Sequence, residues 1–172
     1  VPIDQFYAAI NRAAPSLIRV EADELTYNLH IMLRVEIEQA LIEGRAQPED
    51  LPGLWNDKMQ IYLGIVPERD AEGVLQDVHW SMGAFGYFPT YTLGNLYSVQ
   101  FFEQAQQEIP QLDENMAAGH LLPLRQWLEQ KIHRWGRMFT PDHLARRVTG
   151  SGVSPEPFLR YLEVKYAELY RL

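Results

Sequence analysis

The sequence contains no cysteine among its 172 residues, which excludes disulfide bonds, a thiolate nucleophile and sulfur ligands to a metal. It has no apolar run near the roughly 18 residues of a membrane-spanning helix, and no signal-peptide pattern at its start. Acidic residues outnumber Lys and Arg by 23 to 15, and a net charge of −8 argues against a surface for nucleic acid. These absences predict a cytoplasmic protein that contacts neither membrane nor nucleic acid.

The alternating pattern of β-strands is also missing, and there is no internal repeat. Apolar residues instead recur at three- and four-residue spacing, which predicts an all-α fold forming a single region over 1–172. Caps and breakers delimit the expected helices. These span 4–12, 20–43, 48–64, 74–82, 90–108, 113–119, 123–137, 141–150 and 155–172.

Sequence patterns for common catalytic centres are absent as well. None of the five histidines stands four residues from another, there is no His-Glu-x-x-His sequence, and no metal site is expected in this chain. No Ser or Thr occupies a nucleophile elbow, and no glycine loop has phosphate-binding spacing.

Polar and aromatic side chains concentrate between Gly73 and Tyr91, at a density that an ordinary structural helix does not need. His79 is either a hydrogen-bond or proton-transfer group facing a substrate, or a core histidine bonded to a backbone carbonyl. Tyr87 and Tyr91 are four residues apart and would point to one side of a helix that began at Tyr87. Their hydroxyls either stabilise an oxyanion, or they lie at the surface while the rings pack in the interior.

A second cluster of charged residues begins at Arg19. Arg19 and Asp23 are separated by one helical turn if the helix starts near Val20. An arginine held by a carboxylate presents a rigid fork to a substrate carboxylate, whereas the alternative is a weak surface ion pair.

Both clusters fit one known pattern. Ile18-Arg-x-x-Ala-Asp23 and Gly73-x-x-Gln-Asp-x-His-Trp80 resemble two signature motifs of the carboxypeptidase Taq family of zinc metallocarboxypeptidases. The sequences of 18–31, 85–97 and 157–166 are also similar to that family, so the match runs through nearly the whole chain in order.

The resemblance implies an all-helical homodimeric enzyme, roughly three times this length, that removes C-terminal residues from peptides with a free C-terminus. Family members bind zinc through a His-Glu-x-x-His helix and a later glutamate, both upstream of the region seen here. We therefore expect the chain to be the C-terminal part of such an enzyme, without the metal-binding part, without a cofactor of its own and inactive alone. The start at Val1, which is not an initiator methionine, agrees with that expectation.

The same resemblance implies roles for residues that are present. Arg19 would bind the free carboxylate of the substrate, and His79 would donate to the substrate carbonyl or the oxyanion. Tyr91 would stabilise the oxyanion, and Tyr87 would be a second substrate contact. Three further residues would hold these side chains in position without contacting the substrate: Asp23, Gln76 and Asp77.

Two other hypotheses stay open on the sequence alone. The chain is either a helical peptide-binding module that has lost catalysis, or a plain interaction domain in which both clusters are structural. A His-Glu-x-x-His sequence upstream would separate the enzyme from the module.

Overall fold

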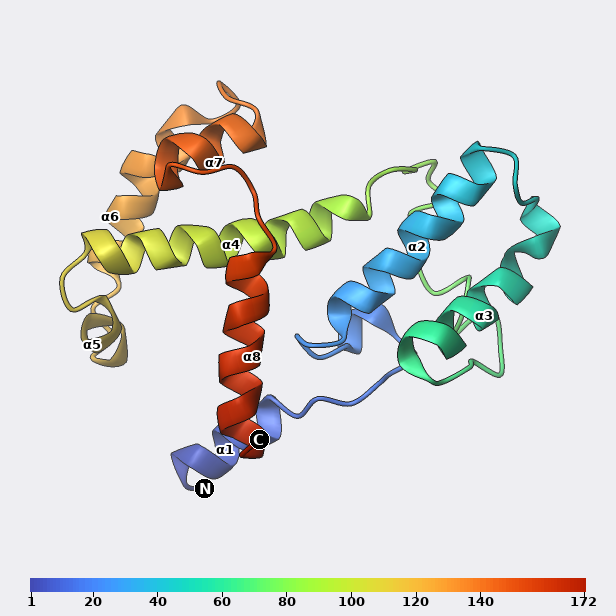
Figure 1. Ribbon diagram of the computed structural model, residues 1–172, viewed down its shortest axis with the longest axis horizontal. Coiled ribbons are helices and arrows are strands. Elements are labelled where there is room, and N and C mark those ends of the chain that lie inside the picture. The colour runs from blue at the N-terminus through green and yellow to red at the C-terminus, as the bar shows by residue number, and fades with distance from the viewer. The chain divides into compact units, whose positions relative to one another are not determined.

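The computed structural model describes residues 1–172 and is built from helices joined by turns and irregular segments (Figure 1). The absence of strands confirms the predicted all-α class. No helix combines the length and apolarity needed to cross a membrane. The α-helices are α1 (Ile3–Ile10), α2 (Tyr27–Ile42), α3 (Leu51–Leu63), α4 (Pro89–Glu108), α5 (Leu112–Ala117), α6 (Leu122–Lys131), α7 (Pro141–Thr149) and α8 (Glu156–Tyr170). Short 3-10 helices are η1 (Arg19–Glu21), η2 (Pro48–Asp50) and η3 (His133–Trp135).

The chain divides into two compact units, Val1–Thr92 and Leu93–Leu172, and the boundary lies within α4. Each unit has its own apolar core. The candidate site residues predicted from the sequence all lie in the first unit.

In the first unit, α2 and α3 lie side by side and bury a common core (Figure 1). Gly64 ends α3 in the left-handed conformation, at φ 70°, as expected for a residue that follows a helix. The buried core residues are Leu33, Ile37, Trp55, Met59, Leu63 and Val74. This core supports one face of the segment that carries the sequence motifs.

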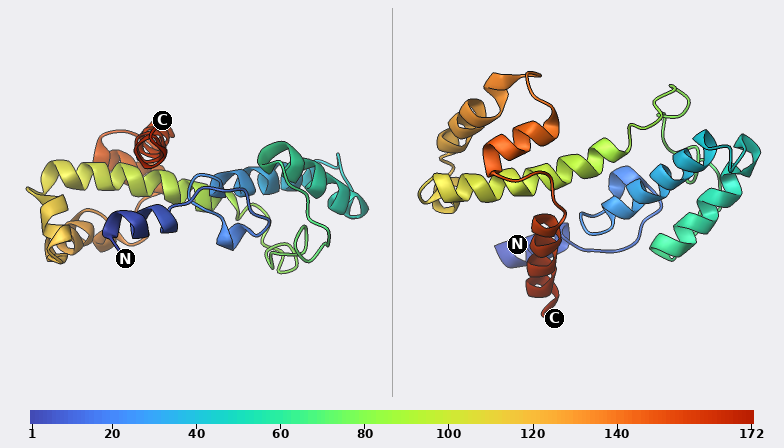
Figure 2. Two further views of the ribbon diagram at one scale, coloured as in Figure 1. Left: turned by 90° about the horizontal axis from the view of Figure 1, so that it is seen from below. Right: turned by 45° about the horizontal axis from the view of Figure 1, so that its top comes forward.

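In the second unit, α5, α6 and α7 gather around the second half of α4 (Figure 2). The start of α7 follows the prediction, because the Thr140 hydroxyl accepts a hydrogen bond from the His143 backbone N–H and Pro141 occupies the first turn. The last helix, α8, buries one apolar face that is formed by Phe158, Leu162 and Tyr166.

Three predicted helices differ from the structure. The helix expected over 123–137 ends at Lys131, because Ile132 leaves the helical conformation (φ −122°, ψ −65°), and the 3-10 helix η3 follows it. The helix expected over 20–43 starts only at Tyr27, because Asp23 accepts hydrogen bonds from the backbone N–H groups of Leu25 and Thr26 and holds a turn there. Residues 74–82 form successive turns instead of a helix. The path of this segment is set instead by side chains of α2, since Arg34 binds Asp77 and Glu38 binds Trp80.

Candidate functional site

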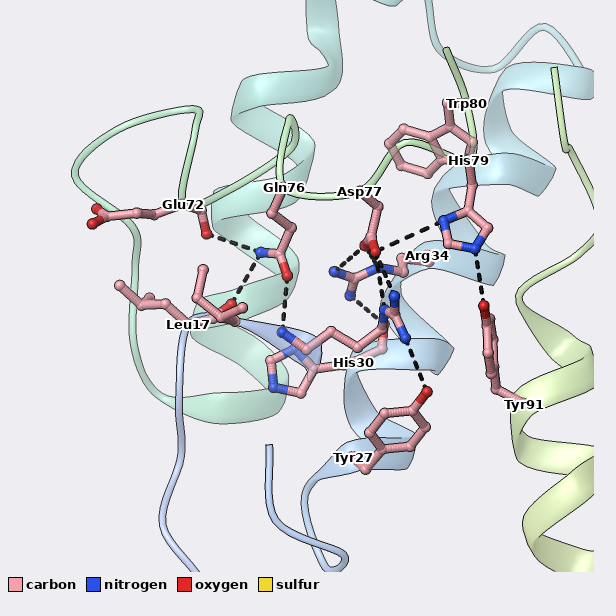
Figure 3. A network of polar contacts seen from close by, with 12 residues as sticks. Leu17, Tyr27, His30, Arg34, Glu72, Gln76, Asp77, His79, Trp80 and Tyr91 are labelled. Carbon is pink, nitrogen blue, oxygen red and sulfur yellow. Dashed lines mark hydrogen bonds and ion pairs between the residues drawn. The ribbon is translucent and has the colours of Figure 1, made fainter. Parts of the chain in front are cut away.

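The site is centred on the carboxylate of Asp77, which is bound by two arginines (Figure 3). Oδ1 accepts hydrogen bonds from Nη2 of Arg19 at 2.6 Å and from its Nε at 3.1 Å. Oδ2 accepts a hydrogen bond from Nε of Arg34 at 2.7 Å. The side chains of Asp77, Arg19 and Arg34 are 12%, 7% and 0% exposed. Two guanidinium groups and one carboxylate leave a net positive charge at a place shielded from water.

Burial and ion pairing act in opposite directions on these three groups. Burial lowers the pKa of Arg34 to about 10, although the charge of Asp77 works against that shift. Burial alone would raise the pKa of Asp77, but hydrogen bonds and charges from Arg19 and Arg34 outweigh it and hold the pKa below its usual value. Asp77 and both arginines are therefore charged at neutral pH.

Arg19 retains donors after these contacts are made. Its Nη1 donates to the Tyr27 hydroxyl at 3.0 Å, and its guanidinium carbon lies 5.0 Å from the centre of the Tyr91 ring. A guanidinium carries five N–H groups, and the three hydrogen bonds leave one on each Nη atom. Those two nitrogens are the pair that binds a carboxylate in an end-on fork.

Asp23 is not the partner of Arg19. Because Arg19–Glu21 forms a 3-10 turn and α2 begins at Tyr27, residues 19 and 23 do not share an α-helical face. The Asp23 carboxylate instead accepts hydrogen bonds from the Ala14 backbone N–H and the Thr26 hydroxyl, both at 2.9 Å. Asp23 thereby ties the chain before η1 to the start of α2.

Gln76 fixes the backbone around Arg19. Its Oε1 accepts from the Arg19 backbone N–H at 2.9 Å, and its Nε2 donates to the carbonyls of Leu17 and Glu72 at 3.0 and 2.9 Å (Figure 3). One amide side chain thus joins the Ile18-Arg motif to the segment that carries Asp77. The two sequence motifs are therefore in direct contact, although Arg19 and Gln76 are 57 residues apart in the chain.

His79 lies beside this ion cluster. Its Nε2 is 3.0 Å from the Tyr91 hydroxyl, and its Nδ1 is 3.8 Å from Oδ1 of Asp77, beyond hydrogen-bond distance. The ring also packs against Phe88, with centroids 4.5 Å apart. The partner of His79 is therefore a tyrosine hydroxyl and not the backbone carbonyl of the structural alternative.

Tyr87 does not begin α4, which starts at Pro89, yet its ring still meets that of Tyr91 edge to face at 5.5 Å. Tyr87 is 49% exposed, whereas Phe88 beside it is buried. The structure therefore brings His79, Tyr87 and Tyr91 into one aromatic group next to Arg19, with Tyr87 at its accessible edge.

Sequence reasoning missed three residues of the site, Arg34, Tyr27 and Glu38. Arg34 joins Asp77 and lies over the Trp55 ring at 4.4 Å. Glu38 accepts hydrogen bonds from Trp80 and Gly86. The sequence does contain a signal for two of them: His30, Arg34 and Glu38 recur every four residues within an apolar helix, and all three are buried. We call these three residues the polar stripe of α2.

His30, the first residue of the polar stripe, is fully buried, and neither of its ring nitrogens makes a hydrogen bond. Burial lowers its pKa to about 4, and the nearby charges of Arg34 and Arg19 act in the same direction. His30 is accordingly neutral at pH 7.

The residues present do not fit a metal ion. Nowhere in residues 1–172 do three or more His, Asp or Glu side chains gather in an arrangement able to ligate one. Asp77 has both oxygens bound by arginines, and His79 Nε2 is bound to Tyr91. What this site offers is hydrogen-bond donors and positive charge, which suit an anionic ligand.

The sequence and fold have clear relatives. The family model described as carboxypeptidase Taq (M32) metallopeptidase matches residues 1–166. Thermostable carboxypeptidase 1 of Thermus thermophilus is 52% identical over 170 residues, 99% of this chain and 33% of the relative. Carboxypeptidase 1 of Bacillus subtilis is 46% identical, over 100% of this chain and 34% of the relative.

A solved structure shows the same likeness in three dimensions. The M32 carboxypeptidase from Deinococcus radiodurans R1 superimposes with a TM-score of 0.96 at 40% identity. The match covers 100% of this chain and 35% of that structure. The chain thus spans about a third of the length of the relatives it matches.

Proposed function

The chain belongs to the carboxypeptidase Taq (M32) metallopeptidase family, and on that premise we propose that it is the substrate-binding part of a metallocarboxypeptidase that releases C-terminal amino acids from peptides. The chain covers only a third of its relatives and has no metal-ligand set. In this proposal the metal, zinc, is ligated by residues outside 1–172, the chain alone is inactive, and the whole enzyme is a cytoplasmic homodimer.

Arg19 binds the terminal carboxylate of the peptide in this proposal. The observation that carries it is the donor count: Arg19 is fixed by Asp77 and Tyr27 and still has one N–H on each Nη atom. The excess positive charge of the Arg19–Asp77–Arg34 cluster favours an anion over a neutral group. A residue inside a peptide chain has no free carboxylate to bind Arg19, so this contact would restrict cleavage to the C-terminal peptide bond.

His79 and Tyr91 act on the scissile carbonyl. One proton lies in their mutual hydrogen bond: when His79 Nε2 carries it, the Tyr91 hydroxyl is free to donate to the negative charge that develops on the carbonyl oxygen. His79 would donate in turn once the substrate oxygen replaces the hydroxyl as its acceptor, and the mutual bond fixes both groups before the substrate arrives. Tyr87, at the exposed edge, is a second contact for the substrate. Asp77, Gln76 and Asp23 hold these groups without touching the peptide.

The test uses paired peptides in the full-length protein that contains this chain, one with a free C-terminal carboxylate and one with a C-terminal amide. Arg19→Ala should lower kcat/KM for the free acid by about 100-fold, a value typical of a lost charge-assisted contact. The amide should be a poor substrate for the parent and the variant alike. Because Arg19 also pairs with Asp77, the melting temperature is expected to fall in this variant.

Arg19→Lys keeps the charge but loses the fork, and it should recover only part of the rate. Arg69→Ala is the matched control, because Arg69 is an exposed arginine paired only with Glu72. Equal losses on the acid and the amide would contradict the carboxylate role. Peptide binding by the full-length protein without any hydrolysis would instead support the peptide-binding module.

A further inference from the structure

Glu38 is a buried carboxylate for which the site described above gives no function. It is 5% exposed and is the last member of the polar stripe of α2. Its Oε1 accepts a hydrogen bond from the indole Nε1 of Trp80 at 2.8 Å, and its Oε2 accepts one from the Gly86 backbone N–H at 3.1 Å. Both oxygens of one carboxylate are therefore committed to the segment that contains His79.

This segment, residues 74–88, has no helix or strand to define its path. Its internal backbone hydrogen bonds form tight turns, such as Gly83 N–H to the Trp80 carbonyl at 3.0 Å and Ala84 N–H to the His79 carbonyl at 2.8 Å. Bonds of this kind shape the turns but do not place them against α2. That placement depends on side-chain anchors and on buried rings.

The anchors from α2 lie on both sides of His79. Arg34 binds Asp77, two residues before His79, and Glu38 binds Trp80, the residue directly after it. Arg34 and Glu38 are one turn apart on α2, so a single rigid face carries both anchors. The second Glu38 contact, at Gly86, holds the far end of the turns that begin at His79.

We propose that Glu38 is a positioning residue that sets the His79 imidazole opposite Tyr91. This inference rests on the proposed function, because it assumes that His79 acts on the substrate. Without the carboxylate, the Trp80 indole N–H and the Gly86 N–H lose their shared acceptor, and residues 79–86 are free to shift. A shift of about 1 Å is enough to break the alignment of a catalytic donor.

The primary test is Glu38→Gln in the full-length protein, assayed on a peptide with a free C-terminus. The amide has a single acceptor oxygen, so it accepts one of the two donors and presents an N–H to the other. We expect kcat to fall by about tenfold or more while KM changes by less than about twofold, because donor alignment counts most in the transition state. A loss of stability with kcat unchanged would overturn the proposal.

Glu36→Gln is the matched control. Glu36 lies two residues earlier on α2, and its carboxylate also accepts two hydrogen bonds, but from Lys58 and Tyr62 of α3. This variant removes an α2 carboxylate without touching the 74–88 segment, so its kcat should equal that of the parent. An equal fall in kcat for Glu36→Gln and Glu38→Gln would mean that general damage to α2 is responsible, and it would overturn the proposal.

Trp80→Phe provides a second route if Glu38→Gln does not fold. It removes the indole N–H but keeps an aromatic ring between Trp55 and Phe88. We expect a smaller fall in kcat in the same direction, together with a change in the His79 imidazole nitrogen resonances. Unchanged kcat and unchanged His79 resonances would overturn the proposal.

A double variant separates this inference from the proposed function. If Glu38 acts through His79, adding Glu38→Gln to His79→Ala should lower kcat no further. A further tenfold fall would mean that Glu38 acts by another route. Full activity of His79→Ala alone would overturn the proposed function itself, whereas an inactive His79→Ala with a fully active Glu38→Gln would overturn only the inference.

Discussion

The Nε2 atom of His79 lies 3.0 Å from the Tyr91 hydroxyl, so a side chain of the 74–88 segment and a side chain of α4 share one hydrogen bond. The Phe88 ring packs against the rings of both residues, with centroids 4.5 Å from His79 and 6.4 Å from Tyr91. The hydrogen bond fixes the His79 imidazole and the Tyr91 hydroxyl relative to each other.

Tyr91→Phe removes the hydroxyl and keeps the ring. In the full-length protein we expect kcat to fall by about 10- to 100-fold, because one donor to developing negative charge is lost. The free energy of unfolding should fall by only about 1 kcal/mol, the usual value of one hydrogen bond. Tyr62→Phe, which loses a hydroxyl bonded to Glu36 away from the site, is the control. Parent-like turnover in Tyr91→Phe would remove the hydroxyl from the mechanism.

Asp77→Asn should be strongly destabilising. It removes the charge shared by Arg19 and Arg34 and leaves the fully buried Arg34 without its counter-ion. Breaking a buried ion pair in this way costs about 3 kcal/mol or more. Urea-induced unfolding measures the change, and Glu72→Gln, at an exposed pair with Arg69, should leave the midpoint unaltered. A midpoint for Asp77→Asn close to the parent would show that the cluster is not a stabilising centre.

Acidification should destabilise the fold through His30. Its pKa is about 4 in the folded protein, below the roughly 6.5 of an unfolded chain. Above pH 6.5 both states are neutral and the full stability is present. Between pH 6.5 and 4 only the unfolded state binds the proton, so stability falls with pH by a total of about 3 kcal/mol and levels off below pH 4.

His30→Gln removes this titrating group, so the total loss of unfolding free energy between pH 6.5 and 4 should become smaller by the same amount. Urea unfolding at several pH values between 7 and 4 measures both losses. NMR titration of His30 gives an independent check, since the ring should remain neutral at pH 5.5. Identical losses for parent and variant would contradict the prediction.

Two glycine-to-alanine substitutions should change the free energy of unfolding in opposite directions. Gly86 has φ 75° and donates its N–H to Glu38, so Gly86→Ala forces an unfavourable backbone conformation and should cost about 1 kcal/mol or more. Gly53 lies inside α3 with open space where the Cβ of an alanine would lie, so Gly53→Ala should stabilise by about 0.5–1 kcal/mol. Thermal unfolding of the two variants decides the matter, and two shifts of the same sign would contradict it.

Helices governed by local signals were predictable from the sequence. Thr140 and Pro141 mark the start of α7, and Gly64 marks the end of α3, because caps act within one turn of the residue that forms them. The helix predicted over 74–82 is wrong because what holds this segment is remote. Asp77 and Trp80 are bound by Arg34 and Glu38, 43 and 42 residues earlier, and no local pattern encodes those bonds.

The candidate site was predictable in part. Arg19, Gln76, Asp77, His79, Tyr87 and Tyr91 do gather in one place, although their roles remain proposals. The partner of Arg19 was misidentified because its pairing with Asp23 assumed a continuous helix from Val20. Arg34 and Glu38 were missed although their four-residue spacing with His30 was a signal, because the same spacing also fits a solvent-exposed polar face, and the structure shows that all three side chains are buried.

The four-residue spacing of His30, Arg34 and Glu38 makes the register of α2 a determinant of the site. Inserting or deleting one residue between Tyr27 and Arg34 would rotate the following residues of α2 by about 100° around the helix axis relative to the preceding ones. Arg34 and Glu38 would then both point away from the 74–88 segment, and their hydrogen bonds to Asp77, Trp80 and Gly86 would be lost together. The hydrophobic content of the sequence would stay the same. Length changes in α2 should therefore be tolerated far less well than substitutions at its solvent-facing positions such as Met32 and Gln39.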